Sequence, residues 1–218
     1  MTDTPLNREL IIKTAVALAD EAGLEKLSMR RLAGMLGIQA MSLYHHIANK
    51  ERLLDAMVDC VYAEIGLMDA GLPWRDAMRA RALTAREVMG RHPWSAAVMN
   101  SREQPGPATL AHHNSVLALL RRDGFSVRLA AHAFSVLDAY IFGFVLTEGT
   151  LPFQTAEEAA ALGKAIQAQM GDAYPAMTEM LVDHVLQPGY TYATEFTNGL
   201  ELILSGLELQ LSAAERNG

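Results

Sequence analysis

Apolar residues recur every three or four positions along most of the chain, which is the spacing of one face of an α-helix. In the first such segment, residues 7–22, Ile11, Ala15 and Leu18 fall on one face, and Gly23 follows as a helix-ending residue. No stretch alternates with the two-residue period of a strand for long enough to predict one. The pattern therefore predicts an all-α fold.

The same periodicity predicts further helices, each bounded by Gly, Pro or polar turn residues, over 29–36, 39–46, 49–65, 75–91, 94–100, 106–123, 126–148, 156–170, 174–187 and 190–212. The stretch "GLMDAGLPW", residues 66–74, carries two Gly and one Pro between two long apolar patterns. We take it as the boundary between an N-terminal domain, residues 1–66, and a C-terminal domain, residues 67–218.

Two short helices separated by a glycine turn stand out near the N-terminus. Ser28 is a good N-cap for helix 29–36, Gly37 ends that helix, and helix 39–46 follows after a tight turn. Leu43 and Ile47 are expected to face inward. This arrangement is that of a helix-turn-helix unit, in which the second helix enters the major groove of DNA.

The outward side of this unit carries residue types that suit DNA. Medium-sized polar side chains can bond to base edges, Ala or Met can contact a thymine methyl, and hydroxyl or cationic groups can hold phosphates. The candidate DNA-binding residues are Ser28, Arg30, Gln39, Ala40, Met41, Ser42, Tyr44, His45, His46 and Lys50.

Charge supports this reading locally. The whole chain has a formal net charge of −7. The segment from Lys26 to Arg52, however, contains five Lys or Arg residues and a single Glu. A phosphate-binding surface needs only such a local stripe. The alternative is an ordinary solvated helix face, since helix-turn-helix geometry also occurs in proteins that never bind DNA.

A family resemblance favours the first reading. The segments "IIKTAVALADEAGLEKLS", "LSMRRLAGMLGI" and "SLYHHIANKERLLDAM" closely resemble the DNA-binding segment of the TetR family of transcriptional regulators. The resemblance implies that residues 39–42 read bases and that phosphates are held by Ser28, Arg30, Tyr44, His46 and Lys50. Tetracycline-type repressors have a Gln-Pro pair where this chain has Ala40-Met41, which implies a different operator sequence.

The C-terminal domain resembles the tetracycline-repressor type of core in its order of helices, which implies a helical bundle that binds a ligand and dimerises through its last long helices. The chain's own pattern agrees, because helix 126–148 is apolar over most of its circumference. Helix 190–212 has Gly199 and Gly206 where another helix could approach closely, beside an apolar side formed by Phe196, Leu200, Ile203, Leu207 and Leu211. We expect a homodimer through these two helices; the alternative is that both form the core of a monomer.

An effector pocket is predicted among the apolar residues of this core. Its candidate residues are Met78, Met89, Trp94, Met99, His113, Leu117, Phe134, Leu137 and Asp138. Each could instead be ordinary core, and we expect Asp138 and His113 to be held by structural hydrogen bonds. The polar and metal-chelating groups of tetracycline repressors are replaced by Gly66, Ala85, Met99, Arg102, Val116 and Thr147, so the resemblance implies a small, mostly apolar effector and no magnesium.

Other features narrow the class of protein. One cysteine, Cys60, is too few for a disulfide framework or a structural zinc site. The polar N-terminus lacks a signal-peptide pattern. The most membrane-like window is interrupted by Asp138 and is shorter than the roughly 20 apolar residues that a membrane span requires. We therefore expect a cytoplasmic protein with no membrane partner and no cofactor. The chain has no HExxH, GxSxG or GxGxxG motif and no Glu three residues before a His, which disfavours a helical enzyme. A transcriptional activator, or an interaction module without DNA binding, remains an alternative to a repressor that binds operator DNA.

Overall fold

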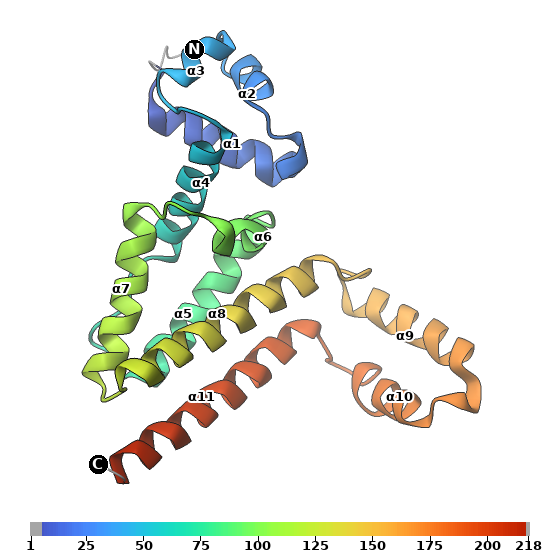
Figure 1. Cartoon of the computed structure of the whole chain (residues 1–218). Coiled ribbons are helices and arrows are strands. Elements are labelled where there is room, and N and C mark those ends of the chain that lie inside the picture. Colours follow the sequence, from blue (N-terminus) through green and yellow to red (C-terminus); the bar gives the residue numbers. More distant parts are fainter. Residues whose placement is uncertain (1–5, 217–218) are drawn as a thin grey trace.

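The computed structural model describes residues 6–216, which are mostly helical and contain no strand (Figure 1). The helices form a small N-terminal head, a body of long helices and an arm that projects from the body. This confirms the all-α prediction.

The head consists of α1 (Arg8–Ala22), α2 (Met29–Met35) and α3 (Ala40–Tyr44). Their apolar faces meet in a common core, as the helical spacing predicts. The fully buried side chains of this core include Ile11, Ala15, Leu18, Leu32 and Leu43.

Helix α4 (Lys50–Ile65) runs from the head into the body (Figure 1). It begins where the Asn49 side chain accepts a hydrogen bond from the Arg52 backbone N–H at 2.9 Å, which is the expected N-cap. The helix contacts α1 on the head side and, further along, the helices of the body. A displacement of α4 would therefore move the head relative to the body.

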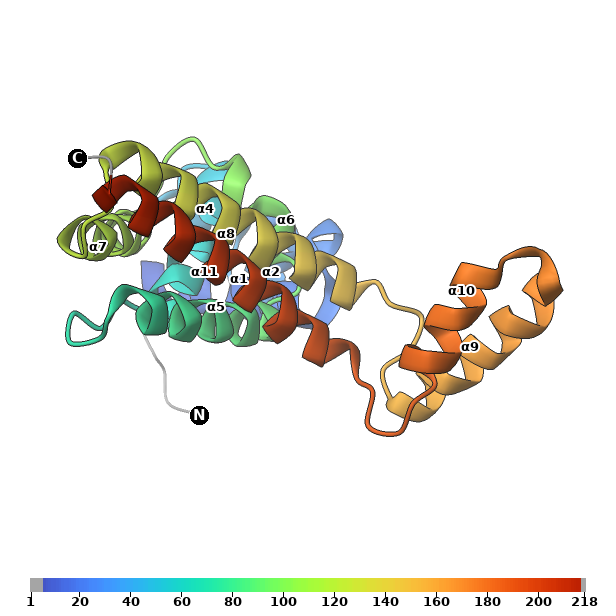
Figure 2. The same ribbon diagram turned by 90° about the horizontal axis from the view of Figure 1, so that it is seen from below.

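The body is built from α5 (Trp74–Arg91), α7 (Pro107–Arg122), α8 (Val127–Gly149) and α11 (Tyr192–Arg216). Helices α8 and α11 lie side by side in both views (Figures 1 and 2). The single helix expected over 94–100 is instead the short α6 (Ser95–Val98) followed by a 3-10 turn over Met99–Ser101, since the last turn tightens as helix ends commonly do.

Helix α11 buries one apolar stripe against the body. Four of the five residues predicted for it are buried, whereas Ile203 is half-buried and its neighbour Leu204 is fully buried. The helical repeat of 3.6 residues explains this difference, because it places position 204 between Leu200 and Leu207 on the same side.

Helix α8 is long and apolar enough, by length and composition, to span a membrane, which corrects the expectation that this window is too short. Half of the apolar window is buried inside the molecule. Its Asp138 is paired with an arginine of α5, as described below. The helix thus has the features of a core helix.

The arm comprises α9 (Ala156–Met170) and α10 (Pro175–Met180), and Figure 2 shows it extending beyond the rest of the molecule. Thr155 and Glu158 form a capping box at the start of α9. The helix expected over 174–187 is shorter, since it passes into a π-helical turn at Leu181–Val185. Leu186 then packs against Gly163 of α9 and closes the arm.

Candidate DNA-binding surface and effector site

The helix-turn-helix unit has the predicted local structure. The Ser28 hydroxyl oxygen accepts a hydrogen bond from the Arg31 backbone N–H at 3.2 Å and caps α2. Gly37 adopts φ +68°, a left-handed conformation that favours glycine, and the chain turns there into α3. Leu43 and Ile47 are buried as expected and fix α3 against the head.

Helix α3 is shorter than the predicted 39–46. It ends at Tyr44, and His45 and His46 lie in the following turn. The His46 N–H donates to the Leu43 carbonyl, three residues earlier, because the chain must bend for Ile47 to reach the core. The outward face of α3 is therefore about one helical turn long, extended by two histidines.

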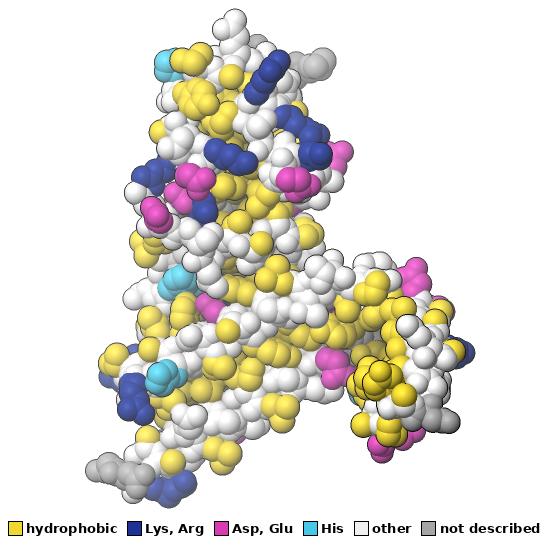
Figure 3. All heavy atoms as spheres, turned by 45° about the vertical axis from the view of Figure 1, so that its right-hand side comes forward, with side chains coloured by type: hydrophobic (Ala, Val, Ile, Leu, Met, Phe, Trp, Pro, Cys, Tyr) yellow, Lys and Arg dark blue, Asp and Glu magenta, His cyan; other side chains and the backbone are white. Residues whose placement is uncertain are grey.

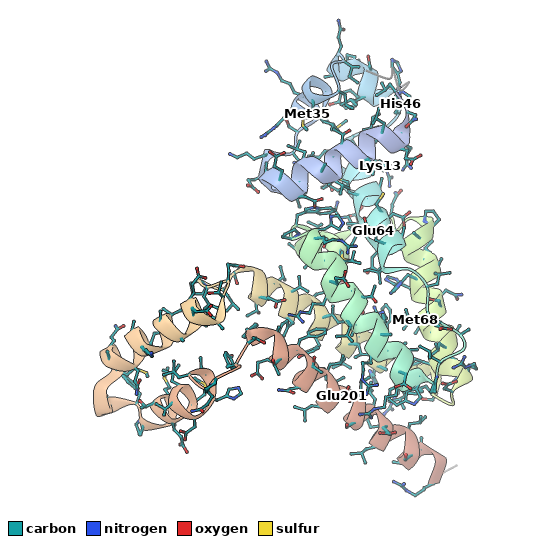
Figure 4. The ribbon with its side chains drawn as sticks, turned by 180° about the vertical axis from the view of Figure 1, so that it is seen from behind. Lys13, Met35, His46, Glu64, Met68 and Glu201 are labelled. Atoms are coloured by element: carbon teal, nitrogen blue, oxygen red, sulfur yellow. The ribbon has the colours of Figure 1, made fainter. Side chains whose placement is uncertain are left out.

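The candidate DNA-binding residues all reach the surface of the head: Ala40 and Ser42 are half-buried and the other eight are exposed. Among residues 6–216, no ion pair or side-chain hydrogen bond occupies the side chains of Arg30, Tyr44, His45, His46 or Lys50. Figure 3 shows several Lys and Arg side chains on the head, and Figure 4 places His46 at the end of the molecule opposite Glu201 of α11. This surface is open to a large partner.

A polar joint connects the head to the body. The buried His92, just after α5, places Nδ1 2.8 Å from the Asp20 carboxylate of α1 and Nε2 3.2 Å from the Glu64 carboxylate of α4. Trp94 donates from Nε1 to the same Asp20 oxygen at 2.7 Å, and Arg91 pairs with Glu64 at 2.9 Å. Figure 4 shows Glu64 where α4 passes from the head into the body.

A second polar group lies deep in the body. Arg81 of α5 is 4% exposed and pairs through Nη2 with the buried carboxylate of Asp138 on α8. Its Nε donates to His112 Nε2 of α7 at 3.0 Å, and His112 Nδ1 donates to the Gly66 carbonyl at the end of α4. A continuous chain of hydrogen bonds therefore links α8, α5, α7 and α4.

The two neighbours of His112 fix its protonation state. Its Nε2 accepts from an arginine, which has no acceptor, so the proton of the neutral ring sits on Nδ1 and points at Gly66. Burial, together with the positive charge of Arg81, lowers the pKa of His112 to about 4. The ring is therefore neutral at physiological pH.

This lowered pKa predicts an acid-dependent loss of stability. In the unfolded chain His112 binds a proton below pH 6.5, whereas in the folded protein it does so only near pH 4. The contribution of His112 to the free energy of unfolding is therefore complete above pH 6.5 and is lost as the pH falls toward 4. From pH 7 to pH 5 the loss is about 2 kcal/mol, at about 1.4 kcal/mol per pH unit. Urea unfolding at both pH values is expected to show a smaller loss in His112→Gln than in the wild type. The variant His45→Gln, at an exposed side chain with no partner in the described chain, should retain the wild-type loss when measured without DNA. Equal losses in His112→Gln and the wild type would contradict the assignment.

Aromatic rings surround this polar group. Tyr62 of α4 contacts the rings of His112 and His113, at centroid distances of 5.3 Å and 5.1 Å. The His113 ring packs edge-on against Phe134 of α8 at 5.0 Å. The guanidinium carbon of Arg81 lies 5.6 Å from the same Phe134 centroid. We refer to Tyr62, Arg81, His113, Phe134 and Asp138 as the inner cluster.

Two family models match the chain. One describes "Bacterial regulatory proteins, tetR family" and covers residues 11–57, and the other describes "Tetracyclin repressor-like, C-terminal domain" and covers residues 69–211. The chain belongs to the TetR family. It is accordingly a DNA-binding transcriptional regulator with an N-terminal helix-turn-helix and a C-terminal helical domain.

Individual TetR-family proteins are similar to this chain over at least four fifths of their own length. An HTH-type transcriptional regulator of Saccharopolyspora erythraea is 33% identical over 93% of this chain and 84% of its own. The HTH-type transcriptional repressor DrrR1 of Streptomyces coeruleorubidus is 34% identical over 98% and 80%. Among solved structures, apo ActR of Streptomyces coelicolor is 26% identical, has a TM-score of 0.79, and matches over 97% of this chain and 99% of its own. A structure of ActR in complex with actinorhodin has also been solved.

The predicted effector residues of this TetR-family chain do not form one group. His113, Phe134 and Asp138 belong to the inner cluster. Trp94 lies at the joint between head and body, and Leu117 is 37% exposed on α7. The other predicted residues are buried apolar side chains of the core: Met78, Met89, Met99 and Leu137. Met89 also lines a separate cavity of about 500 Å³ at the C-terminal ends of α5 and α8.

The expected hydrogen bonds were right for Asp138 and wrong for His113. Asp138 pairs with Arg81, whereas His113 Nε2 is buried without a hydrogen-bond partner among the described residues. The histidine with two partners is the adjacent His112, which the sequence did not single out. Arg81 was also not identified from the sequence, although its side chain connects His112 with Asp138.

Proposed function

We propose that this chain is a homodimeric transcriptional repressor that binds a near-palindromic operator and is released by a small-molecule effector. Residues 1–66 would form the DNA-binding domain and residues 67–218 the effector and dimerisation domain. The protein would act in the cytoplasm, without catalytic activity, cofactor or membrane partner. The observation that carries the proposal is the exposed surface of α3 and its flanks. On this surface the following side chains have no hydrogen-bond or ion-pair partner within the described chain: Arg30, Tyr44, His45, His46 and Lys50.

On the operator, α3 would lie in the major groove. Its short outward face, residues 39–42, would contact base edges. The Ser28 hydroxyl, which accepts a hydrogen bond within the head, still has its own proton to donate to a phosphate. Arg30, Tyr44, His46 and Lys50 would hold further phosphates, and the N-terminus of α4 favours a negative charge beside Lys50.

The dimer would form through the outer sides of α8 and α11. Leu202 and Leu209 of α11 are 77% and 72% exposed, and Gly206 lies between them, where an added Cβ atom would have no neighbour within 4 Å. Val136 and Leu146 of α8 are each 42% exposed on the adjacent helix. A twofold axis through this apolar surface would bury it and place two recognition helices about 34–36 Å apart, one turn of DNA.

One predicted feature of that interface needs revision. Gly199 does not face a partner subunit, because Tyr140 of α8 packs on it from within the same chain. The Tyr140 hydroxyl donates to the Phe196 carbonyl at 2.9 Å. Gly206 therefore remains the glycine at which a second α11 could approach closely.

The effector would act by shifting the head relative to the body. Helix α4 is held at its C-terminal end, where Glu64 contacts His92 and the Gly66 carbonyl accepts a hydrogen bond from His112. A ligand that favours a different position of α4 would change the spacing of the two heads. A tenfold loss of operator affinity requires a difference of about 1.4 kcal/mol between the two states. The solved complex of ActR with actinorhodin supports a small molecule as the effector.

The proposal is tested by measuring stoichiometry and DNA binding together. Analytical ultracentrifugation is expected to give a particle of two chains, and fluorescence anisotropy with the DNA upstream of its own coding sequence is expected to give saturable binding of two chains per duplex that weakens with salt. A monomer in solution, or affinity for that DNA no better than for a scrambled duplex at low salt, would overturn it. In a reporter strain, loss of the gene should raise expression, whereas an activator would lower it.

A further inference from the structure

The inner cluster contains a buried cation with one unused donor. Arg81 donates from Nε to His112 and from Nη2 to Asp138, but its Nη1 is buried with no hydrogen-bond partner among the described residues. Buried side-chain donors in native proteins almost always have a partner, and this holds most strongly for charged ones. The whole residue is 4% exposed, so bulk solvent does not supply that partner freely.

A second unpaired polar atom belongs to the same cluster. His113 Nε2 is also buried and without a partner in the described chain. The His113 ring and the Arg81 guanidinium pack against the same ring, that of Phe134, at 5.0 Å and 5.6 Å. Two unpaired groups from two helices, α5 and α7, therefore lie around a single aromatic side chain of α8.

The surroundings of these two atoms are aromatic. Tyr62, His113 and Phe134 present aromatic surfaces to one another at centroid distances of 5.0 Å and 5.1 Å. His113 and Phe134 are half-buried and Leu117 is exposed, so the cluster is reached from the side of α7 and α8. These rings pack on one another, so an aromatic ligand entering there would replace one of these ring contacts and stack on the remaining rings.

We propose that the effector is an aromatic acid, carrying a carboxylate or an acidic phenol on a flat ring system, and that Arg81 Nη1 and His113 Nε2 bind its anionic oxygens. This deepens the proposed function and rests on it, and it replaces the mostly apolar effector expected from the sequence. A guanidinium that donates to an oxyanion forms a stronger hydrogen bond than one that donates to a neutral oxygen. An acid should therefore be preferred over its ester.

Binding of the anion should also bring a proton into the site. The charged and titratable groups facing His113 are Arg81 and Asp138, which pair with each other, with neutral His112 and Tyr62 beside them. Burial lowers the pKa of His113, so its ring is neutral at pH 7. A second negative charge next to Nε2 favours the imidazolium, so His113 takes up a proton as the acid binds.

The position of the cluster connects the ligand to the DNA-binding head. Tyr62, which would contact the bound ring, belongs to α4, and Arg81 reaches the end of α4 through His112 and Gly66. A ligand that moves Arg81 or Tyr62 therefore acts on the helix that carries the head. This gives the effector a direct route to α4 without a change in the dimer contacts.

Isothermal titration calorimetry of the purified protein without DNA tests the ligand class. The probes are 2-naphthoate and anthracene-2-carboxylate, each compared with its methyl ester, at pH 7 in two buffers of different ionisation enthalpy. We expect each acid to bind at least about tenfold more tightly than its ester, the effect of one charge-assisted hydrogen bond, with net proton uptake. Equal affinity for acid and ester, or no binding of either acid, would overturn the proposal.

Variants assign the binding to His113. His113→Phe keeps a ring against Phe134 and is expected to lose about tenfold in acid affinity and to abolish proton uptake, with ester affinity unchanged. His113→Gln, which can donate but not titrate, should retain more affinity than the Phe variant yet take up no proton. Asn114→Ala, an exposed change on the same helix, serves as the matched control. Undiminished proton uptake in both His113 variants would contradict the assignment.

The two levels of the proposal can fail separately. If an acid binds with these properties but does not release operator DNA, the inner cluster binds aromatic acids and the effector mechanism is wrong. If neutral aromatic compounds release the DNA and the acids do not bind, the repressor function stands and the ligand class is wrong.

Discussion

Asp138→Asn is expected to lower the free energy of unfolding by about 3–5 kcal/mol, because it leaves the guanidinium of Arg81 buried and without its counter-charge. Both partners are almost fully buried, and both also lie within the tightly packed contact of α5 and α8. The amide of Asn can still accept one hydrogen bond, but it carries no charge. The corresponding decrease in melting temperature is roughly 10 °C for a chain of this length.

Thermal unfolding followed by circular dichroism measures this effect, with Glu9→Gln as the control. Glu9 pairs with Lys13 on the surface, and both side chains are more than two-thirds exposed, so that substitution should leave the melting curve unchanged. The double variant Arg81→Met with Asp138→Leu removes both charges and should recover most of the stability. If Asp138→Asn melts with the wild type, the pair does not stabilise the body as inferred.

The same pair illustrates what the sequence could not predict. Arg81 lies in the segment "RDAMRARALTARE", where arginines alternate with small residues and look like an exposed helix face. Its partner is 57 positions away on another helix, so no local pattern links the two. Asp138 was identifiable because a carboxylate inside an apolar helix needs a partner. Its partner could be found only from the packing of α5 against α8.

The adjacent histidines show a limit of a different kind. Neighbouring residues on a helix are separated by about 100°, so His112 and His113 cannot face the same way. The sequence does not fix the rotation of α7 about its axis finely enough to say which one reaches the Gly66 carbonyl. In the structure His112 does so, and His113 is left facing Phe134. Leu117, one turn further along from His113, is exposed for the same reason.

The head was predictable in more detail because its signals are local. The cap at Ser28, the turn at Gly37 and the cap at Asn49 each depend on residues within three or four positions. Those three residues fix both ends of α2 and the starts of α3 and α4. The prediction erred at the end of α3, where burial of Ile47 bends the chain, because that end has no local stop signal.

Tyr44→Ala together with Lys50→Ala is expected to weaken binding to every DNA sequence by about the same factor. The two side chains would supply four phosphate contacts per dimer, and at about 1 kcal/mol each their loss lowers affinity roughly 1,000-fold. Of the two substituted residues only Lys50 is charged, and its loss removes one phosphate contact by a cation in each subunit. The magnitude of the slope of log affinity against log salt concentration should therefore fall by about 0.9 per subunit, or about 2 per dimer. Fluorescence anisotropy over a salt series, with operator and scrambled duplexes, measures both quantities.

The arm provides a matched control for this double substitution. Lys164→Ala with Tyr174→Ala removes the same two residue types from exposed positions on the arm, distant from the head. That variant should bind operator DNA as the wild type does, and both double variants should remain folded dimers by circular dichroism and ultracentrifugation. Because Tyr44 and Lys50 would hold the backbone and not the bases, the ratio of operator to scrambled affinity should stay nearly constant. A selective loss on the operator alone would instead assign these residues to base recognition.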